Sequence, residues 1–186
     1  MKTIKNYRST WIQKSRIFSP ESLLLVLAIF SRLTPHTPNF TALGAVAIFS
    51  GYFFKSRREA FAVALTALLI SDGVLGFYPG VLWVYGAFVA TILVGRALAV
   101  SPKFSWTKTT AANLVAALIF FVVSNFGVWM SAGLYPRTVE GLATCYVAAL
   151  PFFGNTLASQ FLFGTALFLT HRALQRRRAS THLQTI

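Results

Sequence analysis

The sequence has very few acidic residues and only one cysteine, and each scarcity excludes a class of protein. Four of its 186 residues are Asp or Glu, and charged residues of both signs make up 11%. A soluble domain carries about a quarter charged residues, so this chain cannot cover a water-exposed surface. The lone Cys145 excludes an internal disulfide and a zinc cluster built on cysteines. Since hydrophobic residues reach 55%, we expect one all-helical membrane domain.

The sequence also lacks the motifs of common enzymes. It contains no glycine-rich phosphate loop, no Gly-x-Ser-x-Gly elbow and no His-Glu-x-x-His zinc motif. Two of its three histidines, His171 and His182, lie near the C-terminus, which leaves too few ligands for a metal centre elsewhere. We therefore expect a protein that is not an enzyme and has no cofactor. Because a nucleotide-binding motif is missing, any pumping would depend on a separate ATPase.

Hydrophobic runs separated by short polar segments predict six membrane-spanning helices. Ser19, Pro20 and Glu21 are typical of a helix start, because they supply a cap, a proline in the first turn and an acid near the positive end of the helix. Several of the expected helices are shorter than the roughly 20 residues that cross a bilayer. We therefore expect connections that dip into the membrane and line a bowl. The helices are expected at about residues 19–33, 40–54, 59–71, 81–100, 109–132 and 155–170, the last with a short approach from Leu142.

The cations are distributed unevenly between the two sides of this bundle. Residues 1–18 combine cations with apolar side chains, typical of either an amphipathic surface helix or a frayed basic tail. The six-helix domain then covers residues 19–171, and a basic tail covers 172–186. Of the 17 Lys and Arg residues, all but Arg32 and Arg137 lie in the terminal segments or near the second and fourth connections. The positive-inside rule therefore predicts cytoplasmic termini, and we expect no nucleic-acid partner.

The connections with few cations contain the most unusual polar residues. Pro35 and Pro38 fix the backbone of residues 32–41 and would hold the side chains of His36 and Asn39 in a stiff loop. In such a loop His36 could bind a metal or hydrogen-bond a ligand. The alternative is a stable turn whose polar groups satisfy its own backbone.

Other polar residues in these regions are also open to two interpretations. Asp72 follows an apolar run, and an acid near membrane depth needs a partner or a function, so it either pairs with Arg32 or binds a ligand. Asn125 lies in an apolar helix and needs a partner helix or a bound molecule. Tyr85 and its aromatic neighbours either stack on a flat ligand or form an interfacial belt. The candidate ligand-binding residues are His36, Asn39, Asp72, Tyr85, Asn125, Trp129 and Asn155.

Several of these segments together resemble one known family. Residues 32–41, Ser71-Asp72 and residues 124–129 are similar to motifs of a bacterial membrane-protein family known mainly as a domain of unknown function. The resemblance covers about residues 23–170. Its other motifs are at Tyr135-Pro136, Gly141-Leu142, Cys145-Tyr146, residues 149–153 and Asn155-Thr156.

The size, the six short helices and the inside termini are also similar to the S components of energy-coupling-factor vitamin transporters, including the solitary cobalamin-transporter type. This similarity implies an S-component-like bundle with an external bowl for the solute, and a transmembrane coupling protein with ATPases as a partner. In the cobalamin comparison, a cysteine between the third and fourth helices ligates cobalt. This chain has none between Ser71 and Val81, so His36 or Cys145 would have to act as the cobalt ligand of a corrinoid.

These observations predict a membrane transport protein that binds a small vitamin-like solute, such as cobalamin or another corrinoid, in an outward-facing pocket. The alternative is a membrane scaffold or assembly protein whose external loops contact a partner protein. The two functions predict different structures. A transporter gathers the polar residues in one concave pocket, whereas a scaffold spreads them over an exposed patch.

Overall fold

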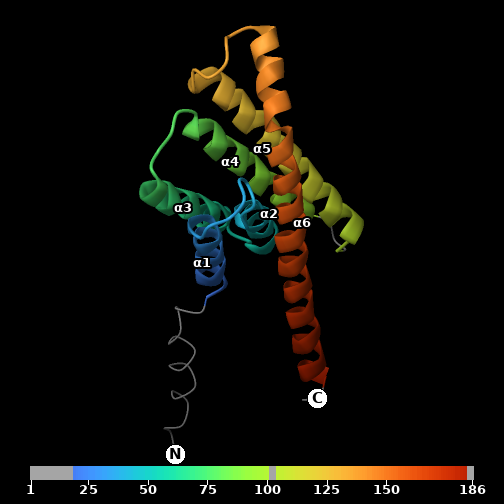
Figure 1. Cartoon of the computed structure of the whole chain (residues 1–186). Coiled ribbons are helices and arrows are strands. Elements are labelled where there is room, and N and C mark those ends of the chain that lie inside the picture. The colour runs from blue at the N-terminus through green and yellow to red at the C-terminus, as the bar shows by residue number, and fades with distance from the viewer. Residues whose placement is uncertain (1–18, 101–103, 184–186) are drawn as a thin grey trace, which may run out of the picture.

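The computed structural model describes residues 19–100 and 104–183, and all regular secondary structure in these ranges is helical. The all-helical fold class is therefore confirmed, while the predicted segment 1–18 lies outside the described residues. Figure 1 shows that α1 begins and α6 ends at the same end of the molecule. The helices are α1 (Pro20–Leu33), α2 (Leu43–Phe53), α3 (Arg57–Leu75), α4 (Val81–Ala99), α5 (Trp106–Ser131) and α6 (Val139–Leu183).

Serine side chains cap the starts of three helices. Ser19 accepts a hydrogen bond of 3.2 Å from the backbone N–H of Ser22, and Pro20 occupies the first turn of α1, as predicted. Ser56 forms the same kind of cap on α3, and Ser105 forms it on α5. Each cap satisfies an N–H group that has no partner within its helix. The local sequence therefore determines where these three helices begin.

The short helix α2 lies at the centre of the bundle and is buried on all sides. Eight of its 11 residues are buried, and it contacts each of the other five helices. It crosses α4 closely, because a Cβ atom on Gly51 would overlap the carbonyl oxygen of Ile92, and one on Gly95 would overlap that of Ile48. Helices approach this closely only where small residues face each other. On its other side, α2 packs against α6 through aromatic rings.

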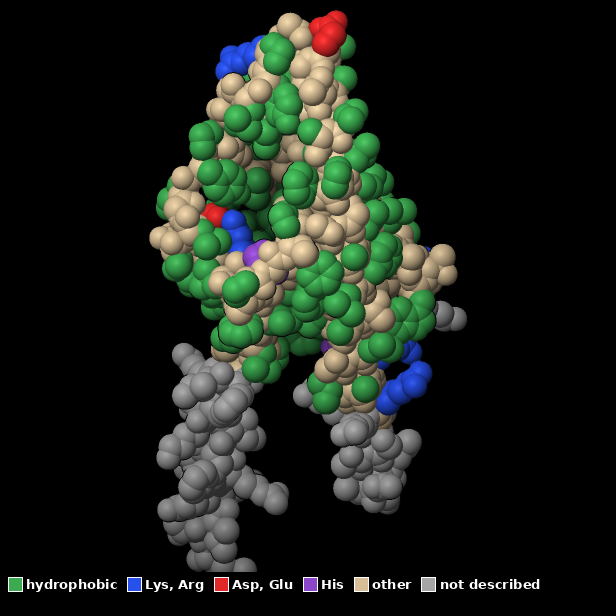
Figure 2. Space-filling view, in the orientation of Figure 1, with side chains coloured by type: hydrophobic (Ala, Val, Ile, Leu, Met, Phe, Trp, Pro, Cys, Tyr) green, Lys and Arg blue, Asp and Glu red, His purple; other side chains and the backbone are tan. Residues whose placement is uncertain are grey.

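Three of the described helices are long and apolar enough to cross a membrane. They are α4, α5 and the part of α6 from Val139 to Arg176, with 19, 26 and 38 residues. Their outer faces carry large apolar side chains such as Leu82, which is 81% exposed, and Figure 2 shows hydrophobic side chains over much of the visible surface. Such a surface indicates a membrane protein. Because α1 and α2 have only 14 and 11 residues, the six-span topology stays a prediction.

Helix α6 differs from the prediction, which placed its start near Asn155 after a separate approach segment. The structure has one continuous helix of 45 residues with Pro151 inside it. A proline removes one backbone hydrogen bond and usually kinks or ends a helix. Here, packing against α5 supports the segment, since the rings of Phe121 and Phe153 have centroids 4.7 Å apart. The helix also continues past residue 171, where the basic tail was expected to begin.

Candidate functional site

A cavity of about 370 Å³, called the central cavity below, lies between the loop after α1 and the inner faces of α2 to α6. Figure 2 shows a hollow on the visible face with acidic, basic and histidine side chains together at its edge. An apolar wall with a few converging polar groups is typical of small-molecule sites. The polar lining residues are Arg32, His36, Asn39, Thr41, Tyr78, Thr91, Ser124, Asn125, Thr156, Ser159 and Gln160. The larger apolar ones are Leu43, Leu68, Leu75, Val84, Phe88, Phe120, Val128 and Phe152.

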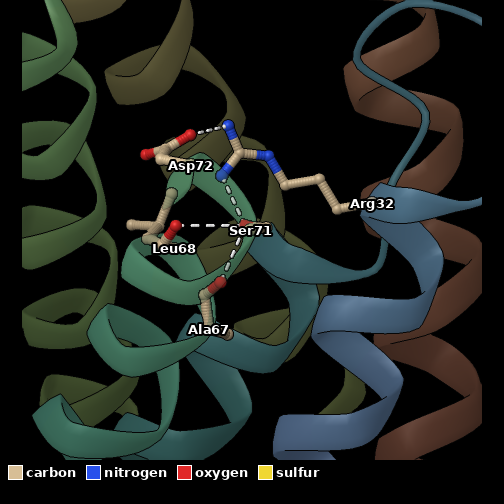
Figure 3. Close-up of polar contacts among 5 residues, drawn as sticks. All are labelled: Arg32, Ala67, Leu68, Ser71 and Asp72. Carbon is tan, nitrogen blue, oxygen red and sulfur yellow. Dashed lines mark hydrogen bonds and ion pairs between the residues drawn. The ribbon is translucent and has the colours of Figure 1, made fainter. Parts of the chain in front are cut away.

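A buried ion pair joins α1 to α3 at one side of the central cavity (Figure 3). Arg32, in the last turn of α1, donates one hydrogen bond to the Asp72 carboxylate at 2.5 Å and another to the Ser71 hydroxyl at 2.8 Å. Ser71 in turn donates to the carbonyl oxygens of its own helix. The Asp72 side chain is fully buried, and that of Arg32 is 15% exposed. Of the two interpretations of Asp72, the pairing with Arg32 is therefore observed, and Arg32 is the partner that lines the cavity.

Two polar atoms near this pair have no hydrogen-bond partner among the described residues. They are the second carboxylate oxygen of Asp72, Oδ2, and the hydroxyl of Tyr85, and both are buried. In Figure 3 Oδ2 points away from Arg32. Neither Asp72 nor Tyr85 lines the central cavity. A buried carboxylate oxygen without a donor is costly, and the Tyr85 hydroxyl is the neighbouring group that can donate to the Asp72 carboxylate. The ion pair with Arg32 is the contact that meets hydrogen-bond geometry.

The loop after α1, which its two prolines predicted to be stiff, is held against α6. Asn39 has a φ of 63°, a left-handed conformation that asparagine tolerates better than most residues. The Asn155 amide donates to the Pro38 carbonyl at 3.0 Å, and the Ser159 hydroxyl donates to the Asn39 carbonyl at 3.4 Å. His36 lines the cavity, and its Nδ1 donates to the carbonyl of Thr34 at 2.6 Å. Asn155 therefore positions the loop and does not line the cavity itself.

Of the two candidate residues on α5, one lines the central cavity and the other binds a neighbouring loop. Asn125 lines the central cavity, and its amide nitrogen donates to the Phe121 carbonyl of its own helix at 2.7 Å. The Trp129 ring nitrogen donates to the Pro136 carbonyl at 2.9 Å, which ties the end of α5 to the following loop. Cys145 is buried outside the cavity, with its sulfur 3.5 Å from the Asn125 carbonyl. Three of the seven candidates, His36, Asn39 and Asn125, therefore line the cavity.

Sequence reasoning missed the polar residues that α6 contributes to the cavity. Thr156, Ser159 and Gln160 repeat at helical spacing within an apolar segment, and this spacing was the signal that they share one face. The Gln160 amide donates to the Asn113 side chain of α5 at 3.2 Å. Arg32 was also not among the candidates, because it was considered only as a partner for Asp72.

Tyr78 contributes a neutral hydrogen-bond donor to the site. Burial, and after it the negative charge of Asp72, raise the pKa of Tyr78 above its usual value of 10.0. The Tyr78 hydroxyl therefore stays protonated at neutral pH and can donate into the cavity. Within residues 19–100 and 104–183, no three His, Cys, Asp or Glu side chains lie together in a way that could hold a metal ion.

One family model matches the chain, over residues 13–182, and its description is "Family of unknown function (DUF6580)". The matched region includes the whole loop after α1, the ion pair and all the residues that line the central cavity. No curated protein and no solved structure matches the chain. The comparisons therefore provide no link to the S components of vitamin transporters.

Proposed function

The chain belongs to DUF6580, a family of unknown function, and we propose that it is a membrane transport protein that binds a small organic solute in the central cavity. The observation that carries this proposal is the cavity itself. It has an apolar wall, converging polar groups and a volume of about 370 Å³, and it lies among helices that can cross a membrane. Pockets of this kind bind small molecules in many proteins.

The size of the cavity favours a solute smaller than a corrinoid. Ligand pockets have volumes of about 300 to 1,000 Å³, and the central cavity is near the lower end of this range. Cys145, one of the two residues considered as a cobalt ligand, lies outside the cavity lining. We therefore propose a single-ring or two-ring vitamin-like compound as the solute. Coupling to a transmembrane partner with ATPases remains part of the proposal, by analogy of architecture with S components.

The alternative function, a scaffold with a patch of exposed polar residues, has less support. Trp129 and Asn155 form hydrogen bonds to carbonyl groups of the same chain. His36, Asn39 and Asn125 converge on one concave site. This arrangement gathers the polar residues around one concavity, with His36 and Asn39 exposed beside it, and does not spread them over a patch.

A steric block in the cavity tests the binding proposal. Ser124 lines the cavity, and its hydroxyl donates only to the Phe120 carbonyl of its own helix. Ser124→Phe should therefore fill the site without leaving a buried polar group unpaired. The matched control is Leu118→Phe, at a position of α5 that is 43% exposed on the outer face.

The measurement is the thermal unfolding of purified protein with a panel of water-soluble vitamins, nucleobases and cobalamin. A ligand at 100 times its Kd should stabilise the protein by about 2.7 kcal/mol. We expect this shift in the parent and in Leu118→Phe, and its loss in Ser124→Phe. A panel without any stabilising compound, or a shift that survives Ser124→Phe unchanged, would contradict the proposal.

We also propose that both termini are cytoplasmic in a bacterial inner membrane. The start of α1 and the end of α6 lie at one end of the molecule, and the α5–α6 connection lies at the other (Figure 1). That connection holds one cation, Arg137, in agreement with the positive-inside rule.

Labelling of single cysteines tests this orientation. Thr138→Cys should react with a membrane-impermeant maleimide on intact spheroplasts, whereas Thr107→Cys should react only after lysis. Both positions are exposed, Thr107 in the first turn of α5 and Thr138 in the α5–α6 connection. The parent chain is the control, because its Cys145 is only 2% exposed and should stay unlabelled. The reverse order of labelling would place the termini outside.

A further inference from the structure

Arg32 is the one permanently charged side chain among the described residues that line the central cavity. Its partner Asp72 is fully buried and does not line the cavity. A ligand that enters therefore meets the cationic member of the ion pair. The hydrogen bonds to Ser71 and Asp72 use one N–H of each terminal nitrogen, and the Tyr78 hydroxyl also contacts the guanidinium, so part of its fork of five donors is left for a ligand. The rest of such a fork matches the geometry of a carboxylate.

The unpartnered oxygen of Asp72 does not offer a competing site for a cation. It is buried, it points away from Arg32 in Figure 3, and its residue is absent from the cavity wall. An ammonium group in the cavity would face Arg32 at close range without access to the Asp72 carboxylate. The arrangement therefore disfavours a cationic ligand.

Another part of the cavity wall suits a flat or apolar body. Phe88 of α4 and Phe120 of α5 both line it, and their ring centroids are 5.3 Å apart. Ala116 and Ala117 lie beside them and leave room because their side chains are small. Aromatic and apolar surface of this kind binds rings. Tyr78, with its raised pKa, adds a neutral donor on the side of Arg32.

We infer that the solute is a small organic carboxylate whose anionic group binds Arg32 and whose apolar body lies against Phe88 and Phe120. The inference rests on the proposed function and names the chemical class of its solute. It gives Asp72 a second role. The Asp72 carboxylate fixes the position of the guanidinium and also competes with the ligand for its charge, so it limits how tightly the anion binds.

Matched sets of acid, amide and amine on the same ring test this inference. The probes are benzoate, benzamide and benzylamine, together with indole-3-acetate, indole-3-acetamide and tryptamine. Thermal unfolding of the full chain in lipid nanodiscs measures their binding. We expect the acids to stabilise the protein and the matched amides and amines to have little effect.

Two substitutions in the ion pair test whether Arg32 binds the acid. In Asp72→Asn the bound acid becomes the main counter-charge of Arg32, so its affinity should rise by about tenfold and the thermal shift should grow. Arg32→Lys keeps the charge beside Asp72 but loses the planar fork, and acid affinity should fall by about tenfold. The control is Arg137→Lys, because that guanidinium donates to the Met130 carbonyl outside the cavity. It should leave acid affinity unchanged.

The outcomes separate this inference from the proposed function. Amides or amines that bind as well as the acids overturn the inference, and so does an Asp72→Asn variant that binds acids less tightly. If such a neutral or cationic probe loses its binding in Ser124→Phe, the cavity is still a solute site and only the anionic class is wrong. If no probe and no compound of the vitamin and nucleobase panel binds, both proposals fail.

Discussion

Gly95→Val should prevent the chain from reaching its folded state. Even a Cβ atom at position 95 would overlap the carbonyl oxygen of Ile48, and backbone atoms of a buried helix cannot move aside as a flexible side chain can. Overpacking typically costs about 1 to 3 kcal/mol and occasionally more. We expect the upper part of this range or beyond, since α2 would have to separate from α4 along its length. Gly51→Val should have the same effect, because Gly51 meets the Ile92 carbonyl at the same crossing.

The measurement is the yield of monodisperse protein after detergent extraction, followed by its thermal unfolding temperature. Gly86→Val is the matched control in the same helix, because nothing lies within 4 Å of a Cβ atom built on Gly86. Its effect on the free energy of unfolding should stay within about 0.5 kcal/mol. Equal stability of Gly95→Val and Gly86→Val would show that the close crossing of α2 and α4 is not required for the fold.

Arg32→Met should also destabilise the fold strongly, for an electrostatic reason. The variant leaves the fully buried Asp72 carboxylate without its cation, and removal of one partner of a buried ion pair costs about 3 to 5 kcal/mol. The double variant Arg32→Met/Asp72→Leu should recover most of this loss, because an apolar pair of similar volume needs no charge compensation. Arg137→Met, which removes an exposed arginine from the α5–α6 connection, should change stability little.

The measurement is the thermal unfolding temperature of the single and double variants. A double variant no more stable than Arg32→Met would mean that Asp72 contributes to the fold through something other than this pair. The same double variant also separates folding from binding. It should fold like the parent but fail to bind organic carboxylates, whereas Ser124→Phe should lose the binding of any solute.

The elements that could be predicted from the sequence are those with a local cause. The start of α1 follows from the Ser19 cap and Pro20, and the structure has both. Asp72 next to an apolar run required a partner or a ligand, and Arg32 is that partner. By contrast, the last helix was expected to start only near Asn155, and the structure has one continuous α6 with Pro151 inside it. The aromatic contacts with α5 that keep the helix continuous there are long-range and leave no local signal.

The candidate site could be predicted only in part, because a sequence indicates which end of a helix a residue occupies better than which way its side chain faces. His36, Asn39 and Asn125 line the cavity. The polar groups of Trp129 and Asn155 are instead bound to backbone carbonyls. The polar face of α6 was overlooked because an apolar segment with a few hydroxyl groups looks lipid-facing until the rotation of the helix is known.

The burial of α2 on all sides has a consequence for how the protein enters a membrane. Its 11 residues rise roughly 16 Å, about half the thickness of the hydrocarbon core. A segment this short cannot remain stably in lipid by itself, so it depends on neighbours that are synthesised later. One of them is α6, whose Phe168 ring packs against Phe49 of α2. The most enclosed helix of the bundle is therefore among the first to leave the ribosome and among the last to reach its final environment.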